Sequence, residues 1–63
     1  MRISVCEVTC LRWVAEGKSY RDISVLERVS DDEVALHVSN AVAKLGASTP
    51  AEAIQNAKVR GVI

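Results

Sequence analysis

Two cysteines and one histidine are the side chains of this chain best suited to metal or nucleophilic chemistry. Cys6 and Cys10 stand four positions apart, so they share one face of a helix. Thiolates at this spacing can bind zinc, but a zinc site usually takes four ligands, and His37 is far away in the sequence. Free cysteine is also among the most commonly buried residue types. We therefore expect ordinary packing, with no metal and no cofactor.

Catalysis needs a nucleophile, a base and a group that orients the base. The chain offers a single histidine, two cysteines on one predicted helix and scattered carboxylates. It contains no glycine-rich loop of the kind that holds phosphate groups. We predict that the protein is not an enzyme.

The charge balance bears on nucleic-acid binding. Eight Lys and Arg residues offset eight Asp and Glu residues, so the formal net charge is zero. Proteins that bind duplex DNA usually carry a basic surplus, because much of their affinity comes from neutralising phosphates. A zero total lowers this expectation but does not exclude DNA, since charge can be segregated by face. No segment approaches the roughly 18 apolar residues of a membrane span, and we expect a cytoplasmic location.

Helix punctuation along the 63 residues predicts a small all-α domain. A serine precedes each of the first three helices, and an acidic residue follows it three positions later, at Glu7, Asp22 and Glu33. This spacing is typical of the capping box. Pro50 stands at the first position of the last helix, where proline is favoured. We expect helices over 4–16, 19–28 and 30–45, and from about 49 until Gly61 closes the fourth.

Apolar residues at helical spacing predict the faces that pack together. The third helix has the most regular stripe, and we expect the terminal Val62 and Ile63 to fold back onto the core. The residues expected to face inward are Cys10, Leu11 and Val14, then Ile23 and Leu26, then Val34, Val38, Ala41 and Leu45, and finally Ala53, Ile54, Ala57 and Val59.

Several motifs together resemble one family. Residues 11–19, LRWVAEGKS, resemble the L-x-x-V-A-E-G-x-S stretch of the LuxR/FixJ (GerE-type) DNA-binding domain. Val34, the run HVSN at 37–40 and KLG at 44–46 resemble its T-V-x-x-H-V-x-N-x-x-x-K-L-G signature. The match covers nearly the whole chain without a gap. It implies a four-helix LuxR-type domain over 1–63, in which the second and third helices form a helix-turn-helix.

The resemblance also implies a function. The chain would be the DNA-binding domain of a transcriptional regulator, with the third helix in the major groove of double-stranded DNA and a homodimer formed through the fourth helix. Leu36, Ser39 and Asn40 would lie nearest the bases. The backbone contacts would come from Lys18, Arg21, His37 and Lys44, and the dimer contact from Ala53, Ile54 and Ala57.

The start of the third helix departs from the family pattern. Glu33 stands where the family commonly has a phosphate-binding threonine, and Ala35 where it commonly has lysine or arginine. Asp31 and Asp32 add negative charge to the same turn. Carboxylates stabilise a helix N-terminus, but they oppose phosphate there. This leaves an alternative, a degenerate helix-turn-helix that pairs with another LuxR-type protein and binds DNA weakly or not at all. On DNA, Ala35 and Leu36 could contact a thymine methyl group, and in the alternative they would form part of the protein contact together with Ala43.

Overall fold

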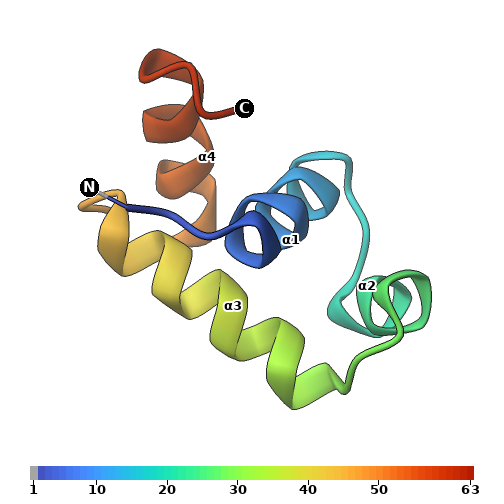
Figure 1. The fold of residues 1–63 in the computed structure, drawn as a ribbon. Helices are drawn as coiled ribbons and strands as arrows, with labels where there is room; N and C mark the ends of the chain where they lie inside the picture. Colours follow the sequence, from blue (N-terminus) through green and yellow to red (C-terminus); the bar gives the residue numbers. More distant parts are fainter. Residues whose placement is uncertain (1) are drawn as a thin grey trace.

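The computed structural model describes residues 2–63 and folds them into four α-helices. Helix α3 is the longest, and each of the other three helices packs against it (Figure 1). The described residues contain no strand, which confirms the all-α prediction. The helices are α1 (Val5–Ala15), α2 (Tyr20–Glu27), α3 (Asp31–Lys44) and α4 (Pro50–Val59). The expected ranges differ mainly because they included the capping residues.

All four helices begin at a hydroxyl N-cap. The side chains of Ser4, Ser19, Ser30 and Thr49 each accept the backbone N–H three residues later, at 3.1 Å. The capping box is complete for α1 and α2, where the acidic side chain also accepts from the cap backbone.

The predicted capping box of α3 is wrong in its second half. Ser30 accepts from the Glu33 N–H, but the Glu33 carboxylate lies 3.7 Å from Nε2 of His37. The side chain therefore turns along the helix towards the residue four positions later instead of returning to the cap.

The core consists of two adjacent groups of buried side chains. Val42 of α3 packs against both groups. The stripe predicted for α3 is confirmed, because all four of its residues are buried, and the predicted return of Val62 and Ile63 onto the core is confirmed as well. The first group is Leu11, Ala41, Leu45, Ala53 and Ala57, and the second is Cys10, Ile23, Val34 and Val38.

Two predicted core residues lie at the surface instead. Leu26 is 50% exposed, because the inward face of α2 is centred between the neighbouring buried residues Ile23 and Ser24. Val59 is 86% exposed. It follows Ala57 by two positions, which places it on the opposite side of α4.

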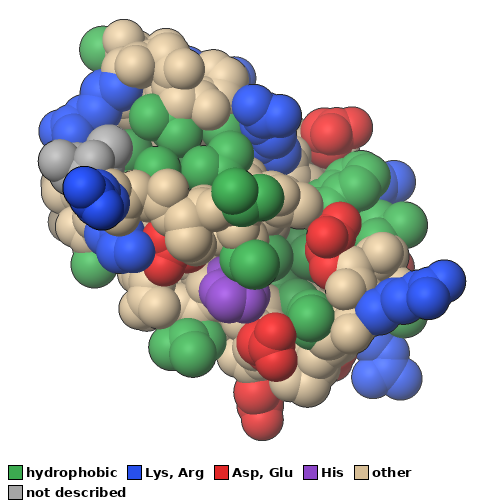
Figure 2. Space-filling view, viewed as in Figure 1, with side chains coloured by type: hydrophobic (Ala, Val, Ile, Leu, Met, Phe, Trp, Pro, Cys, Tyr) green, Lys and Arg blue, Asp and Glu red, His purple; other side chains and the backbone are tan. Residues whose placement is uncertain are grey.

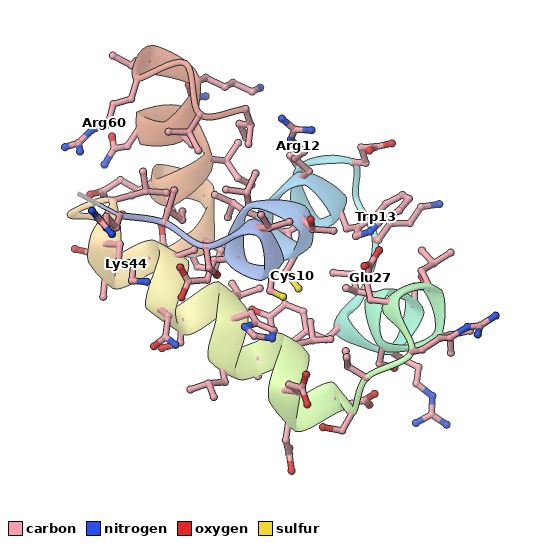
Figure 3. All side chains as sticks on the ribbon, in the orientation of Figure 1. Cys10, Arg12, Trp13, Glu27, Lys44 and Arg60 are labelled. Carbon is pink, nitrogen blue, oxygen red and sulfur yellow. The ribbon has the colours of Figure 1, made fainter. Side chains whose placement is uncertain are left out.

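Polar side-chain contacts join pairs of helices. The Asn56 side-chain amide donates to the Leu45 carbonyl at 2.9 Å, so α4 satisfies a carbonyl at the end of α3. The Trp13 indole N–H donates to Glu27 at 2.8 Å and joins α1 to α2 (Figure 3). Arg28 ends α2 with φ 58°, a left-handed conformation that turns the chain towards α3.

Over residues 2–63, no helix has the length and hydropathy needed to cross a membrane.

Candidate nucleic-acid interface

Helices α2 and α3 and the turn between them form the helix-turn-helix, and the outer side of α3 is covered by no other helix (Figure 1). Leu36 is 56% exposed at the middle of this side. Ala35 is half-buried at its margin. We call the following residues the outer face of α3: Asp32, Ala35, Leu36, Ser39, Asn40 and Ala43.

One margin of the outer face borders the start of α2. Ala35 and Ser39 line a shallow groove together with Tyr20, the first residue of α2, with Ser48 from the α3–α4 connection, and with Pro50, the first residue of α4. Lys18 and Arg21 flank Tyr20 in the sequence and are exposed. Arg21 reaches the start of α3, where it lies 3.5 Å from Asp31, whereas Lys18 borders the exposed side of α2 with Asp22, Val25 and Leu26.

Lys44 is held by another helix. Its Nζ donates to both carboxylate oxygens of Glu7 in α1, at 2.8 and 3.0 Å. The Glu7 side chain is 6% exposed, and it also accepts the Ser4 backbone N–H. The hydrogen bond from Lys44, followed by that from Ser4, lowers the Glu7 pKa below its ordinary value, against the opposing effect of burial. The ammonium expected on a phosphate is thus engaged within the protein.

His37 occupies the margin of α3 that faces α1. Its side chain is 21% exposed and borders a small crevice lined by α1 residues, among them Val5, Cys6 and Thr9. Figure 2 shows the histidine between apolar and acidic side chains. Helical spacing places His37 away from Ser39 and the α2 margin. His37 and Lys44 therefore lie on the side of α3 away from Ser39, while Asn40 is about one turn from each of them.

Two of the three acids at the start of α3 lie near a nitrogen-bearing side chain of the same protein. Asp31 lies 3.5 Å from Arg21, and Glu33 lies near His37. The Arg21 side chain is 80% exposed, and an exposed pair of this kind contributes little energy, so its guanidinium can exchange the carboxylate for a phosphate. The sequence analysis missed both pairings, although the four-residue spacing of Glu33 and His37 is a detectable signal.

The two cysteines differ in exposure. Cys6 is exposed, whereas Cys10 is buried, and neither is in a disulfide. Burial, with smaller contributions from nearby Glu27, Cys6 and Glu33, raises the pKa of the Cys10 thiol, so it stays protonated at neutral pH. Residues 2–63 contain no group of three or more side chains placed to hold a metal ion.

The residues expected at the dimer contact lie largely inside the protomer. Ala53 and Ala57 have no exposed surface, and Ile54 is half-buried against the same core group. The small alanines allow α4 to approach α1 and α3 within one chain. A contact between copies through α4 would need the opposite side of the helix.

Comparison with known proteins agrees with this architecture. Residues 1–57 match the family described as "Bacterial regulatory proteins, luxR family". The transcriptional activator protein VanR of Vibrio anguillarum is 46% identical over 57 residues, which are 90% of this chain and 24% of VanR. The transcriptional repressor ThaA of Burkholderia thailandensis is 37% identical over 62 residues, covering 98% of this chain and 26% of ThaA.

The transcriptional activator protein LuxR of Aliivibrio fischeri is 39% identical over 57 residues, which are 90% of this chain and 23% of LuxR. The chain thus spans about a quarter of the length of these relatives. The family match extends from the start of the chain into α4 and includes the whole helix-turn-helix. The chain belongs to the luxR family of bacterial regulatory proteins.

Proposed function

We propose that this chain, as one domain over 1–63, is the DNA-binding part of a transcriptional regulator and places α3 in the major groove of duplex DNA. The observation that carries this proposal is the uncovered outer face of α3 beside the start of α2, where the exposed Arg21 reaches the first turn of α3. Relatives are named as activators and as a repressor, so the proposal concerns DNA binding and not the direction of regulation. Binding to DNA fits a cytoplasmic location.

The contacts divide into two kinds. Lys18 and Arg21 bind phosphates, which position the domain without reading sequence. Leu36, Ser39 and Asn40 meet the base edges. The acids at the start of α3 oppose phosphate, although the charge of Asp31 is partly offset by Arg21. With so few free cations, affinity is modest and falls with salt.

A symmetric dimer is the form in which such a domain best recognises DNA, because paired domains bind two half-sites one helical turn apart. Exposed residues four positions apart, Ala51, Gln55 and Val59, form a continuous stripe on the outer side of α4. Val59 is 86% exposed and supplies apolar area that the protomer does not cover. We assign the dimer contact to this stripe in place of Ala53 and Ala57.

A fluorescence anisotropy titration of the 63-residue chain against a mixed-sequence duplex tests the proposal. We expect binding at about 50 mM salt that weakens as salt rises. Lys18→Ala and Arg21→Ala should each weaken binding and reduce the salt slope by about 0.9 per lost contact. Arg12→Ala is the matched control, since Arg12 extends from α1 away from α3 (Figure 3).

Absence of binding at low salt would refute this function. That result would favour the alternative function, in which the domain pairs with another LuxR-type protein. Equal losses from Arg12→Ala and Arg21→Ala would refute the assigned surface.

A further inference from the structure

We propose that α3 recognises A·T base pairs through thymine methyl groups and the hydrogen-bonding edge of adenine, and that it does not read guanine. This specificity rests on the proposed DNA-binding function. It follows from which side chains the fold leaves available on the outer face of α3.

The first step is the absence of a guanine-reading cation on this face. Arginine and lysine are the usual partners of the guanine O6 and N7 acceptors. Lys44 is the one lysine or arginine within α3, and Glu7 holds its ammonium with two hydrogen bonds on the α1 side. The exposed Asp32 adds a carboxylate one turn before Leu36, and this negative charge repels guanine acceptors.

The second step is what the outer face offers instead. Leu36 is 56% exposed, and Ala35 beside it is half-buried, so both present methyl groups to the groove. Apolar side chains of this kind complement the thymine 5-methyl group. Because the methyl is absent from the other DNA bases, an apolar contact at this place favours thymine.

The third step concerns the two amide and hydroxyl side chains. Asn40 and Ser39 are exposed, and no hydrogen bond or ion pair within residues 2–63 engages either side chain. An asparagine amide pairs with adenine by donating to N7 and accepting from N6. Leu36 and Asn40 are one turn apart, roughly 6 Å along the helix, so the methyl and amide contacts fall on base pairs that are neighbours or nearly so.

The experiment begins by selecting the preferred site of the full 63-residue chain from a randomised duplex pool. In the selected site, each thymine is then replaced by uracil, which lacks only the 5-methyl group. In separate duplexes, adenine or guanine is replaced by its 7-deaza analogue, which lacks the N7 acceptor. None of these changes alters the phosphate charge, so the contribution of the backbone contacts is constant.

We expect uracil and 7-deazaadenine each to weaken binding several-fold, and 7-deazaguanine to leave it unchanged. Loss of affinity with 7-deazaguanine would overturn the inference, because it would show that a side chain reads guanine. Insensitivity to both uracil and 7-deazaadenine would also overturn it. In either case the parent duplex still binds, whereas failure of the proposed function appears as no binding to any duplex.

Two variants assign the effects to individual side chains. Leu36→Ala should reduce the uracil effect and keep the 7-deazaadenine effect, whereas Asn40→Ala should abolish the 7-deazaadenine effect and keep the uracil effect. Both positions are exposed, so circular dichroism should show an intact fold. Glu16→Ala, at the exposed end of α1, is the control and should retain both effects. If both variants kept the full sensitivity of the parent chain, these residues would not be the readers.

Discussion

The margin of α3 that faces α1 and the outer face of α3 use their polar residues in opposite ways. On the margin that faces α1, Lys44 and His37 lie near carboxylates of the same protein. On the outer face, Ser39 and Asn40 are exposed and unengaged within residues 2–63. A basic residue on a recognition helix is therefore not by itself a DNA contact. Its availability depends on which neighbouring helix its side chain reaches.

The largest expected effect comes from removing the contact between Glu7 and Lys44 on the margin that faces α1. Glu7→Ala removes the partner of Lys44 and half of the capping box that starts α1. We expect the free energy of unfolding to fall by about 2–4 kcal/mol, from a lost cap and lost charge-assisted hydrogen bonds. Lys44 is 40% exposed and can turn into solvent, which limits the loss. Urea unfolding followed by circular dichroism measures the change.

Glu16→Ala is the control for that substitution, because Glu16 is exposed at the end of the same helix. We expect it to change stability by less than about 0.5 kcal/mol. Equal effects from Glu7→Ala and Glu16→Ala would contradict a structural role for the Lys44 pair.

A second experiment compares one residue of the outer face with one residue of the margin that faces α1. Asn40→Ala should weaken DNA binding by about 1–3 kcal/mol and leave stability nearly unchanged, because the exposed side chain makes no hydrogen bond within residues 2–63. Lys44→Gln should do the opposite, with lower stability and little change in the affinity of the folded protein. Anisotropy titrations and urea unfolding on both variants make the comparison. A large affinity loss in Lys44→Gln would show that Lys44 leaves Glu7 to bind phosphate.

A third substitution adds a cation to the outer face. Ala35→Lys restores the charge that the family commonly carries there, and the lysine stem can extend past Tyr20 and Ser39 into solvent. We expect an affinity gain of about 1 kcal/mol at low salt and a salt slope steeper by about 0.9. Ala15→Lys adds the same charge on α1, one turn after Arg12 and on the same side of that helix, and is the matched control. Equal gains from both variants would indicate a net-charge effect and not a contact of α3.

The features that the sequence predicted are local ones. Helix starts follow from a hydroxyl residue and its spacing to an acid, and the buried stripe of α3 follows from a 3.6-residue period. The resemblance to the LuxR family supplied the identity of the helix-turn-helix. The errors at Leu26 and Val59 arose because spacing alone does not fix the centre of a buried face on a short helix.

The features that the sequence missed depend on packing between distant segments. Glu7 and Lys44 are 37 positions apart, and their pairing requires α1 to lie along α3. For the same reason, the alanines of α4 were assigned to a dimer when they pack within one protomer. A small residue allows close helix contact both within one protomer and between two protomers, and only the folded structure distinguishes these two cases. The DNA contacts of Lys18, Arg21, Leu36, Ser39 and Asn40 stay predictions.

The smallest expected effect is a pH dependence that belongs to the α1 margin alone. Hydrogen bonds from Lys44 and Ser4 hold the Glu7 pKa below 4.5 in the folded chain, so folding favours the ionised carboxylate. Its contribution to stability is therefore complete above about pH 4.5 and is lost as the pH falls through the lowered folded pKa. Glu7→Gln removes this group from the titration and should make the unfolding free energy less dependent on pH in that range. Urea unfolding at a series of acidic pH values measures both chains, and parallel pH profiles would show that other carboxylates govern the acid response.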